Sequence, residues 1–201
     1  MAINLSKGQK INLAKNESSS GLGEISVNLN WNSTPVKKGF LSSLFGSSGI
    51  DLDLGCLYEL KDGSKGAVQA LGNSFGSTVY PPYVSLDGDD RTGQSAAGET
   101  LRINGNQISQ IKRILVFTFI YEGVANWQQA DGIVTIKYPG AEDIVVKMDS
   151  YNNSNKMCAL ALLENVDDST FSVEKLIQFY SGHEAMDRAF GWGMRWTPGR
   201  K

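Results

Sequence analysis

A period of two in hydrophobicity constrains this chain more than any other feature of its sequence. Segment 24–31 (EISVNLNW) places Ile25, Val27, Leu29 and Trp31 at every second position. Successive side chains of a β-strand point to opposite faces, so this pattern is typical of a strand with one buried face. Further predicted strands, bounded by Gly, Asn or Asp, are 51–60, 67–71, 99–103, 113–121, 132–138, 143–148, 157–164 and 171–180. Strands at this spacing indicate an all-β sandwich or barrel.

Two of the predicted strands are apolar at nearly every position. They are 114–121 (ILVFTFIY) and 157–165 (MCALALLEN), and both are expected to be central strands with little solvent on either face. Ala and Leu also favour helix, which is the alternative for the second segment. Asn and Asp on both sides of it favour the strand. Helix is predicted only as short pieces, near 107–112 and over 183–190.

The composition excludes several classes of protein. A chain of 201 residues suits one domain or at most two small ones, and a formal net charge of −2 gives no overall positive field to attract nucleic acid. Cys56 and Cys158 are far apart, which excludes a disulfide framework and fits a reducing interior. Both lie in apolar strand patterns, which predicts inert core thiols. No apolar run approaches the ~18–20 residues of a membrane span, and no apolar stretch follows the charges of MAINLSKGQK. We therefore expect a cytoplasmic protein without a nucleic-acid partner.

Acidic residues gather in two parts of the sequence. Asp51 and Asp53 are two apart in a predicted strand, which places both carboxylates on one face. The second group consists of Asp87, Asp89, Asp90 and Glu99. Asp and Gly are common turn formers, so the second group alone is compatible with a hydrophilic turn. Convergence of both groups, with Asn73 as a neutral oxygen donor, instead predicts a metal site.

The donor atoms indicate which metal such a site would hold. A hard cation such as Ca²⁺ takes ~6–8 oxygen ligands, and acids interrupted by glycines can supply carboxylate and backbone oxygens together. The spacing is not that of an EF-hand, because the glutamate at the twelfth position is absent. Zinc is disfavoured, since it prefers His and Cys and the single histidine has no thiol near it in sequence. We expect Ca²⁺ first and Mg²⁺ second.

A Ser- and Gly-rich segment at about 33–50 is predicted to be an inserted loop. Its apolar residues include Phe40 and Phe45. These side chains can pack onto the body of the domain, form a docking tip for a protein partner, or touch a membrane surface weakly. The sequence leaves these alternatives open.

The C-terminal part carries a weak catalytic pattern. His183 and Asp187 are four residues apart, so a helix would place them on one face. Neither a G-x-S-x-G elbow nor a glycine-flanked cysteine accompanies them, and we expect no enzymatic activity. Gly191 and Gly193 lie between aromatic residues but lack the strand-then-helix context of a phosphate-binding loop.

Several long segments resemble the TerD/TerA-type tellurium-resistance (stress-response) domain family. The matching segments are LSKGQKINL at 5–13, GLGEISVNLNW at 21–31, GIDLDLGCLYEL at 49–60, DGDDRTG at 87–93, GETLRINGNQI at 98–108 and RILVFTFIYEG at 113–123. The tail GHEAMDRAFGWGMRW at 182–196 resembles the TerA branch. The resemblance implies a β-sandwich of two antiparallel sheets with minor short helices, a single domain over 1–201, and calcium binding in the bacterial cytoplasm.

The family's acidic motifs are matched only in part. Asp51 and Asp53 match its D-x-D-L-D strand motif, whereas Gly49 replaces the first acid. Asp89 matches its G-D-N-L-T-G loop, and Asp90 stands where Asn is usual. The acidic run that follows in TerD-type members is reduced here to Glu99. The resemblance therefore implies one good calcium site and a weaker second.

The expected function is that of a calcium-binding, non-enzymatic scaffold or sensor in a bacterial tellurite and stress-resistance system. Its partners would be other proteins of that complex, with weak membrane-surface association through the complex. The alternative is a carbohydrate- or small-ligand-binding module shaped by calcium. In that alternative Trp127, Trp192, Trp196 and Tyr83 are candidate stacking platforms, although tryptophan is more often buried or at an interface.

Overall fold

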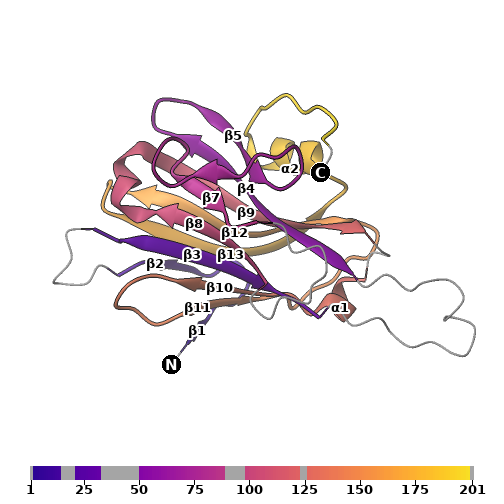
Figure 1. Ribbon diagram of the computed structural model, residues 1–201. Helices are drawn as coiled ribbons and strands as arrows, with labels where there is room; N and C mark the ends of the chain where they lie inside the picture. The colour runs from indigo at the N-terminus through magenta and orange to yellow at the C-terminus, as the bar shows by residue number, and fades with distance from the viewer. Residues whose placement is uncertain (1, 15–20, 33–49, 89–97, 123–125, 200–201) are drawn as a thin grey trace, which may run out of the picture.

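Two β-sheets stacked face to face form the body of the protein in a computed structural model (Figure 1). The structure describes residues 2–14, 21–32, 50–88, 98–122 and 126–199. Within these residues the first sheet has seven strands, in the order β1 (Ile3–Asn4), β11 (Ile144–Lys147), β10 (Ile133–Lys137), β3 (Glu24–Asn30), β8 (Glu99–Asn104), β7 (Val84–Leu86) and β6 (Gly76–Ser77). The second sheet has six strands, in the order β2 (Lys10–Asn12), β13 (Thr170–Tyr180), β12 (Met157–Val166), β9 (Ile111–Glu122), β4 (Asp51–Leu60) and β5 (Lys65–Gln69).

The all-β sandwich is confirmed. Neighbouring strands are antiparallel apart from β1, which pairs in parallel with β11 at the edge of the first sheet. The described helices are short: the 3₁₀-helix η2 (Gly105–Gln110), α1 (Trp127–Ala130) and α2 (His183–Phe190). Both helical segments expected from the sequence are present, and α1 was not predicted.

The main core lies between the two sheets. Strand β3 contributes Ile25, Val27 and Leu29, and all three are completely buried. This is the face that the period-two pattern predicted. Burying a side chain of this size stabilises the fold by roughly 1.5–3 kcal/mol. The sandwich is therefore specified mainly by such alternating strands.

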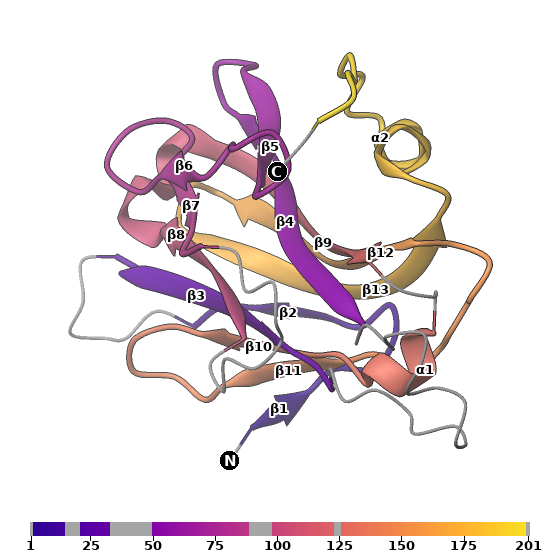
Figure 2. The same ribbon diagram turned by 45° about the vertical axis from the view of Figure 1, so that its right-hand side comes forward.

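A second apolar cluster covers the outer face of the second sheet. Phe117 of β9 and Met157 of β12 pack there with Met186 of α2 and Trp192. Figure 2 shows α2 beside the second sheet, on the side away from β1 and the N-terminus. Strands β9 and β12 are thus buried on both faces, as their continuous apolar runs predicted. Segment 157–165 is strand rather than helix.

Some elements differ from the sequence prediction. Strands β1, β2, β6 and β7 have two or three residues each, too few to show a period. Strand β5 occupies Lys65–Gln69 instead of 67–71, because residues 70–73 form a turn in which the backbone N–H of Asn73 donates to the carbonyl of Ala70. The predicted loop around Phe40 and Phe45 lies outside the described residues apart from Ile50. None of the described helices has the length and hydrophobicity needed to cross a bilayer.

Candidate functional site

The first candidate site is at the start of β4. Asp51 and Asp53 are 9% and 0% exposed, so this acid pair is buried and not on a wet surface. Leu52 and Leu54 alternate with them and pack in the core between the sheets. The two carboxylates therefore share the opposite face of β4, as the spacing predicted. Asp53 is paired across the strands with Phe119 of β9.

Glu99 joins this strand from the other sheet. It is the first residue of β8 and is 2% exposed. Its Oε2 accepts a hydrogen bond of 2.6 Å from the backbone N–H of Leu54. The pairing of β4 with β5 begins at Gly55, so the Leu54 N–H lies in the part of β4 that β5 does not cover. Glu99 of the first sheet is therefore linked to β4 of the second sheet at the residue that follows Asp53.

Polar side chains of the first sheet hold both strands in place. The indole Nε1 of Trp31 donates to the carbonyl of Ile50 at 3.0 Å, directly before Asp51. The amide Nδ2 of Asn28 donates to the backbone carbonyl of Glu99 at 3.3 Å. These bonds fix the start of β4 and the start of β8 relative to β3. The acids are thus placed by the rigid part of the fold.

The other sequence-predicted ligands are not all at this position. The carboxylate of Asp87 accepts hydrogen bonds of 2.8 and 2.6 Å from Nε of Arg102. Asn73 lies in the exposed turn after β5, with a positive φ of 54°. Asp89 and Asp90 lie outside the described residues. Among the residues that are described, no group of three or more His, Cys, Asp or Glu side chains is arranged to hold a metal ion.

The described acids nevertheless suit a hard cation in chemistry. Asp51, Asp53 and Glu99 offer carboxylate oxygens, the ligand type that Ca²⁺ prefers. Burial of a carboxylate costs several kcal/mol unless positive charge or hydrogen bonds compensate it. Glu99 obtains part of this compensation from Leu54. A divalent ion held by these residues would supply neutralising charge, and the remaining oxygens would have to come from residues outside this trio.

The two cysteines are placed as core residues, as predicted. Both are free and buried. Burial raises the pKa of Cys56 to about 12 and also raises that of Cys158. At neutral pH both side chains are therefore thiols, which are poor nucleophiles and poor metal ligands. This arrangement disfavours direct thiolate chemistry on an oxyanion such as tellurite.

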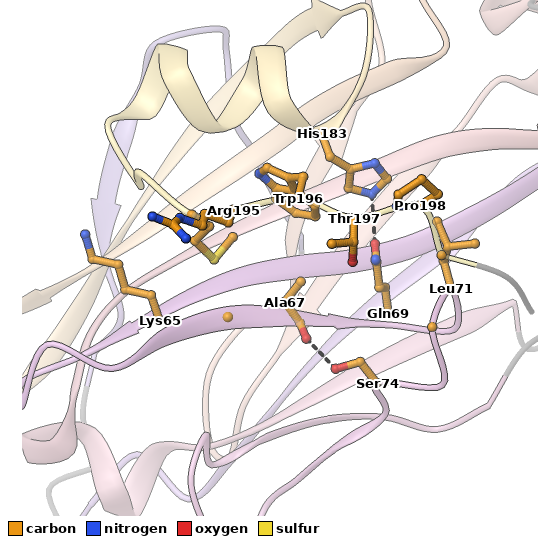
Figure 3. Close-up of a pocket in the computed structure, with 14 residues that line it drawn as sticks. Lys65, Ala67, Gln69, Leu71, Ser74, His183, Arg195, Trp196, Thr197 and Pro198 are labelled. Carbon is orange, nitrogen blue, oxygen red and sulfur yellow. Dashed lines mark hydrogen bonds between the residues drawn. The ribbon is translucent and has the colours of Figure 1, made fainter.

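A second candidate site is a pocket that the sequence analysis missed. It has a volume of about 820 Å³ and lies between β5 and residues 191–199, which we call the C-terminal segment. Lys65, Ala67 and Gln69 alternate along β5 and form one side, and Arg195, Trp196 and Pro198 form the other (Figure 3). The residues come from distant parts of the chain, so no local motif announces the pocket.

Asp187 holds the C-terminal segment in place. Its carboxylate is 2% exposed and accepts hydrogen bonds from the backbone N–H of Gly193 at 2.7 Å and of Met194 at 3.0 Å. It also accepts one from the indole Nε1 of Trp196 at 3.1 Å. Gly191 and Gly193 have positive φ angles of 64° and 73°, which glycine adopts without strain. The G-W-G pattern is therefore a turn wrapped around Asp187 and does not form a phosphate loop.

Arg113 fastens the same turn to the sheet. Its guanidinium carbon lies 3.8 Å from the ring centroid of Trp192. Its Nη1 donates to the carbonyl of Phe190 at 2.9 Å, and its Nε donates to Glu59 at 2.6 Å. Stacking and hydrogen bonding by one planar group are what distinguish Arg from Lys.

His183 contacts the pocket from α2. Its Nε2 lies 2.8 Å from Oε1 of Gln69, and its ring packs edge-on against Phe117 and Phe119. Burial lowers the pKa of His183 to about 4, so the ring is neutral at physiological pH. The helical spacing suggested a His183–Asp187 pair. The structure instead directs the two side chains to Gln69 and to the C-terminal segment.

The aromatic residues divide into core and pocket. Trp127 and Trp192 are almost completely buried, which excludes both as exposed platforms for sugar stacking. Tyr83 packs on the main core. Trp196 lines the pocket, with its ring 4.9 Å from that of His183.

Comparisons with known proteins agree on one family. The family model described as TerD domain matches residues 1–139. The chain is 45% identical over 192 residues to tellurium resistance protein TerA of Alcaligenes sp., covering 95% of this chain and 56% of that protein. It is 31% identical over 141 residues to tellurium resistance protein TerX of Serratia marcescens, covering 61% of this chain and 64% of that protein. The chain thus spans between about half and two thirds of these relatives' length.

Two solved structures share the fold at low sequence identity. The crystal structure of the unknown function protein SAV2460 has a TM-score of 0.61 at 14% identity, covering 88% of this chain and all of that one. A homologue of telluride resistance protein (TerD), SCO6318 from Streptomyces coelicolor A3(2), has a TM-score of 0.55 at 15% identity, covering 83% of this chain and 95% of that one. These likenesses show the fold, and the match of the family model over residues 1–139 shows that the chain belongs to the TerD domain family.

Proposed function

We propose that the chain is a calcium-binding, non-enzymatic scaffold or sensor domain of a bacterial tellurite and stress-resistance system. The observation that carries the proposal is the burial of Asp51 and Asp53 at the start of β4, near Glu99 of β8, which is buried as well and accepts a hydrogen bond from the Leu54 N–H of the same strand. Strand β4 belongs to the second sheet and β8 to the first. An ion held by acids from both would connect the two layers of the sandwich. The names of the relatives, tellurium resistance proteins TerA and TerX, support the biological setting.

The proposed mechanism is linkage between ion binding and order. An ion that binds only the folded state at ~100 times its Kd adds about 2.7 kcal/mol of stability. Residues 89–97 join Gly88 to Gly98, directly before Glu99, and they carry Asp89 and Asp90. Participation of these acids would couple this connection to calcium. A surface ordered in this way would dock other cytoplasmic proteins of the same resistance system.

Calorimetric titration of chelator-treated protein with Ca²⁺ and with Mg²⁺ tests the proposal. We expect calcium to bind with one strong site and a weaker second, and to raise the melting temperature. Asp53→Asn removes a buried charge at little change in volume and should abolish most of both effects. Asp168→Asn is the matched control, because Asp168 is an exposed acid paired with Lys61 at 2.8 Å. Equal melting curves in EDTA and in millimolar calcium would exclude the calcium role.

A second candidate function is binding of a carbohydrate or another small ligand. The pocket beside His183 favours it, since about 820 Å³ lies within the usual range for ligand sites. A neutral sugar would be expected to stack on Trp196. Loss of glycan binding in Trp196→Leu, with calcium binding intact, would support this function over the first.

A further inference from the structure

The pocket beside His183 is positively charged in a protein of net negative charge. Lys65 and Arg195 line it, and no Asp or Glu is among the described residues of its lining. Figure 3 shows the Arg195 guanidinium directed toward the end of the pocket where Lys65 lies. Among the described acids none forms an ion pair with Arg195, and its side chain is at an exposed position.

The cation of Lys65 has two described partners: its Nζ donates to the carbonyl of Trp192 at 2.8 Å and lies near the carboxylate of Glu59. Glu59 is buried and binds Arg113 at 2.6 Å and Lys112 at 2.8 Å, whereas the Lys65 Nζ lies 3.9 Å away. Three cations therefore share one carboxylate, and Arg195 adds a positive charge to the pocket that Lys65 lines. Like charges gathered in a partly enclosed space raise the local concentration of anions. This end of the pocket is suited to an acidic group.

The other end has a different chemistry. Ala67, Leu71 and Pro198 give it an apolar lining, and Trp196 adds a planar aromatic side chain. Gln69 and Ser74 supply polar groups at its edge. The side chain of Gln69 is oriented by His183 and that of Ser74 by the carbonyl of Ala67. Apolar walls with a few fixed polar groups are typical of small-molecule sites.

We propose that this pocket binds a small organic anion with a planar, apolar body. Its phosphate, sulfonate or carboxylate group lies between Lys65 and Arg195, and its body packs against Trp196 and the apolar wall. The inference rests on the second proposed function, ligand binding, and gives its ligand a chemical class. It does not depend on calcium, because none of the acids at the start of β4 lines the pocket.

Calorimetric titration with two probes tests the proposal and separates the sources of the anionic group. The probes are AMP, which carries a phosphate, and 8-anilinonaphthalene-1-sulfonate, which carries a sulfonate. We expect at least one to bind below millimolar concentration, equally with and without EDTA. Adenosine and inorganic phosphate, the two halves of AMP, should each bind at least about tenfold more weakly than AMP if AMP is the probe that binds.

Variants locate the binding site. Arg195→Gln removes one charge from an exposed side chain. It should lower the affinity for the probe about tenfold or more, the usual effect of losing a charged hydrogen bond. Arg188→Gln is the control, because Arg188 is exposed on α2 and is not among the pocket's lining residues. Failure of both probes to bind would overturn the proposal. Equal affinity of Arg195→Gln and the unaltered protein would overturn it as well, whereas loss of calcium binding alone would affect only the first proposed function.

Discussion

The start of β4 and the pocket beside His183 are built in opposite ways. Asp51 and Asp53 lie inside a ten-residue strand that is hydrogen-bonded to β9 along its length. One wall of the pocket is the C-terminal segment. Among the described residues from Arg195 onward, the Trp196 indole makes the one hydrogen bond to the rest of the protein. The acids cannot move without disrupting a sheet. In the pocket wall, Trp192 is buried and stacked on Arg113, whereas residues 193–199 are held through the carboxylate of Asp187. We therefore expect the first site to report on the whole fold and the outer part of the pocket wall to report on Asp187.

The largest expected effect tests that dependence on Asp187. Asp187→Ala leaves three donors, two backbone N–H groups and one indole, without their common acceptor. Leaving buried donors without an acceptor costs about 1–3 kcal/mol. We expect residues 193–199 to detach and Trp196 to become exposed, which a red shift of tryptophan fluorescence would report, together with a lower urea midpoint.

The matched control is Glu184→Ala on the same helix. Its partner Arg188 is 3.0 Å away at i,i+4 and both side chains are highly exposed, so the loss should be at most a few tenths of a kcal/mol. A fluorescence spectrum of Asp187→Ala equal to that of Glu184→Ala would break the comparison, since the segment would then be held by other contacts.

The second prediction is a pH dependence of the free energy of unfolding that comes from His183 beside the pocket and not from Asp51 or Asp53. Burial lowers the pKa of His183 from 6.5 to about 4, so the unfolded chain binds more protons than the folded one between these values. The contribution of His183 to the free energy of unfolding is therefore largest above pH ~6.5. It falls as the pH decreases toward 4 and is constant below pH 4. Between pH 7 and pH 5 the loss is about 2 kcal/mol.

Urea unfolding at several pH values measures this loss. His183→Gln lacks the titrating ring, so its stability should decline less over the same interval than that of the unaltered protein. The difference between the two slopes isolates His183 from the carboxylates, which remain in both proteins. Parallel curves for the two proteins between pH 7 and pH 5 would contradict the assignment.

The same contrast explains what sequence could predict. Strand β3 and the placement of Asp51 and Asp53 on one face of β4 follow from a period of two within a single segment, whereas the burial of the two acids was not predicted. The partner of Glu99 could not be predicted, because the Leu54 N–H that it accepts from is 45 positions away and is available only where β5 ends. The pocket was missed for the same reason: Lys65 and Arg195 meet only after the C-terminal segment folds back over β5. The period and spacing of residues predict which side chains share a face of a strand. They do not predict which segments far apart in the sequence come into contact.

The smallest expected effect tests whether Asp87 belongs to the acid site at the start of β4. Sequence placed Asp87 among the calcium ligands, whereas the structure pairs it with Arg102, whose Nη2 is 2.6 Å from Oδ2 of the carboxylate. Both side chains are more than a third exposed, so the pair contributes at most about 1 kcal/mol. Asp87→Asn should therefore lower the urea midpoint slightly and leave the calcium affinity unchanged, in contrast to Asp53→Asn. Arg102 also binds Glu24 at 2.6 Å, which keeps its side chain in place in the variant. A tenfold loss of calcium affinity in Asp87→Asn would mean that Asp87 leaves Arg102 for the ion, and the two acidic groups would then converge as the sequence predicted.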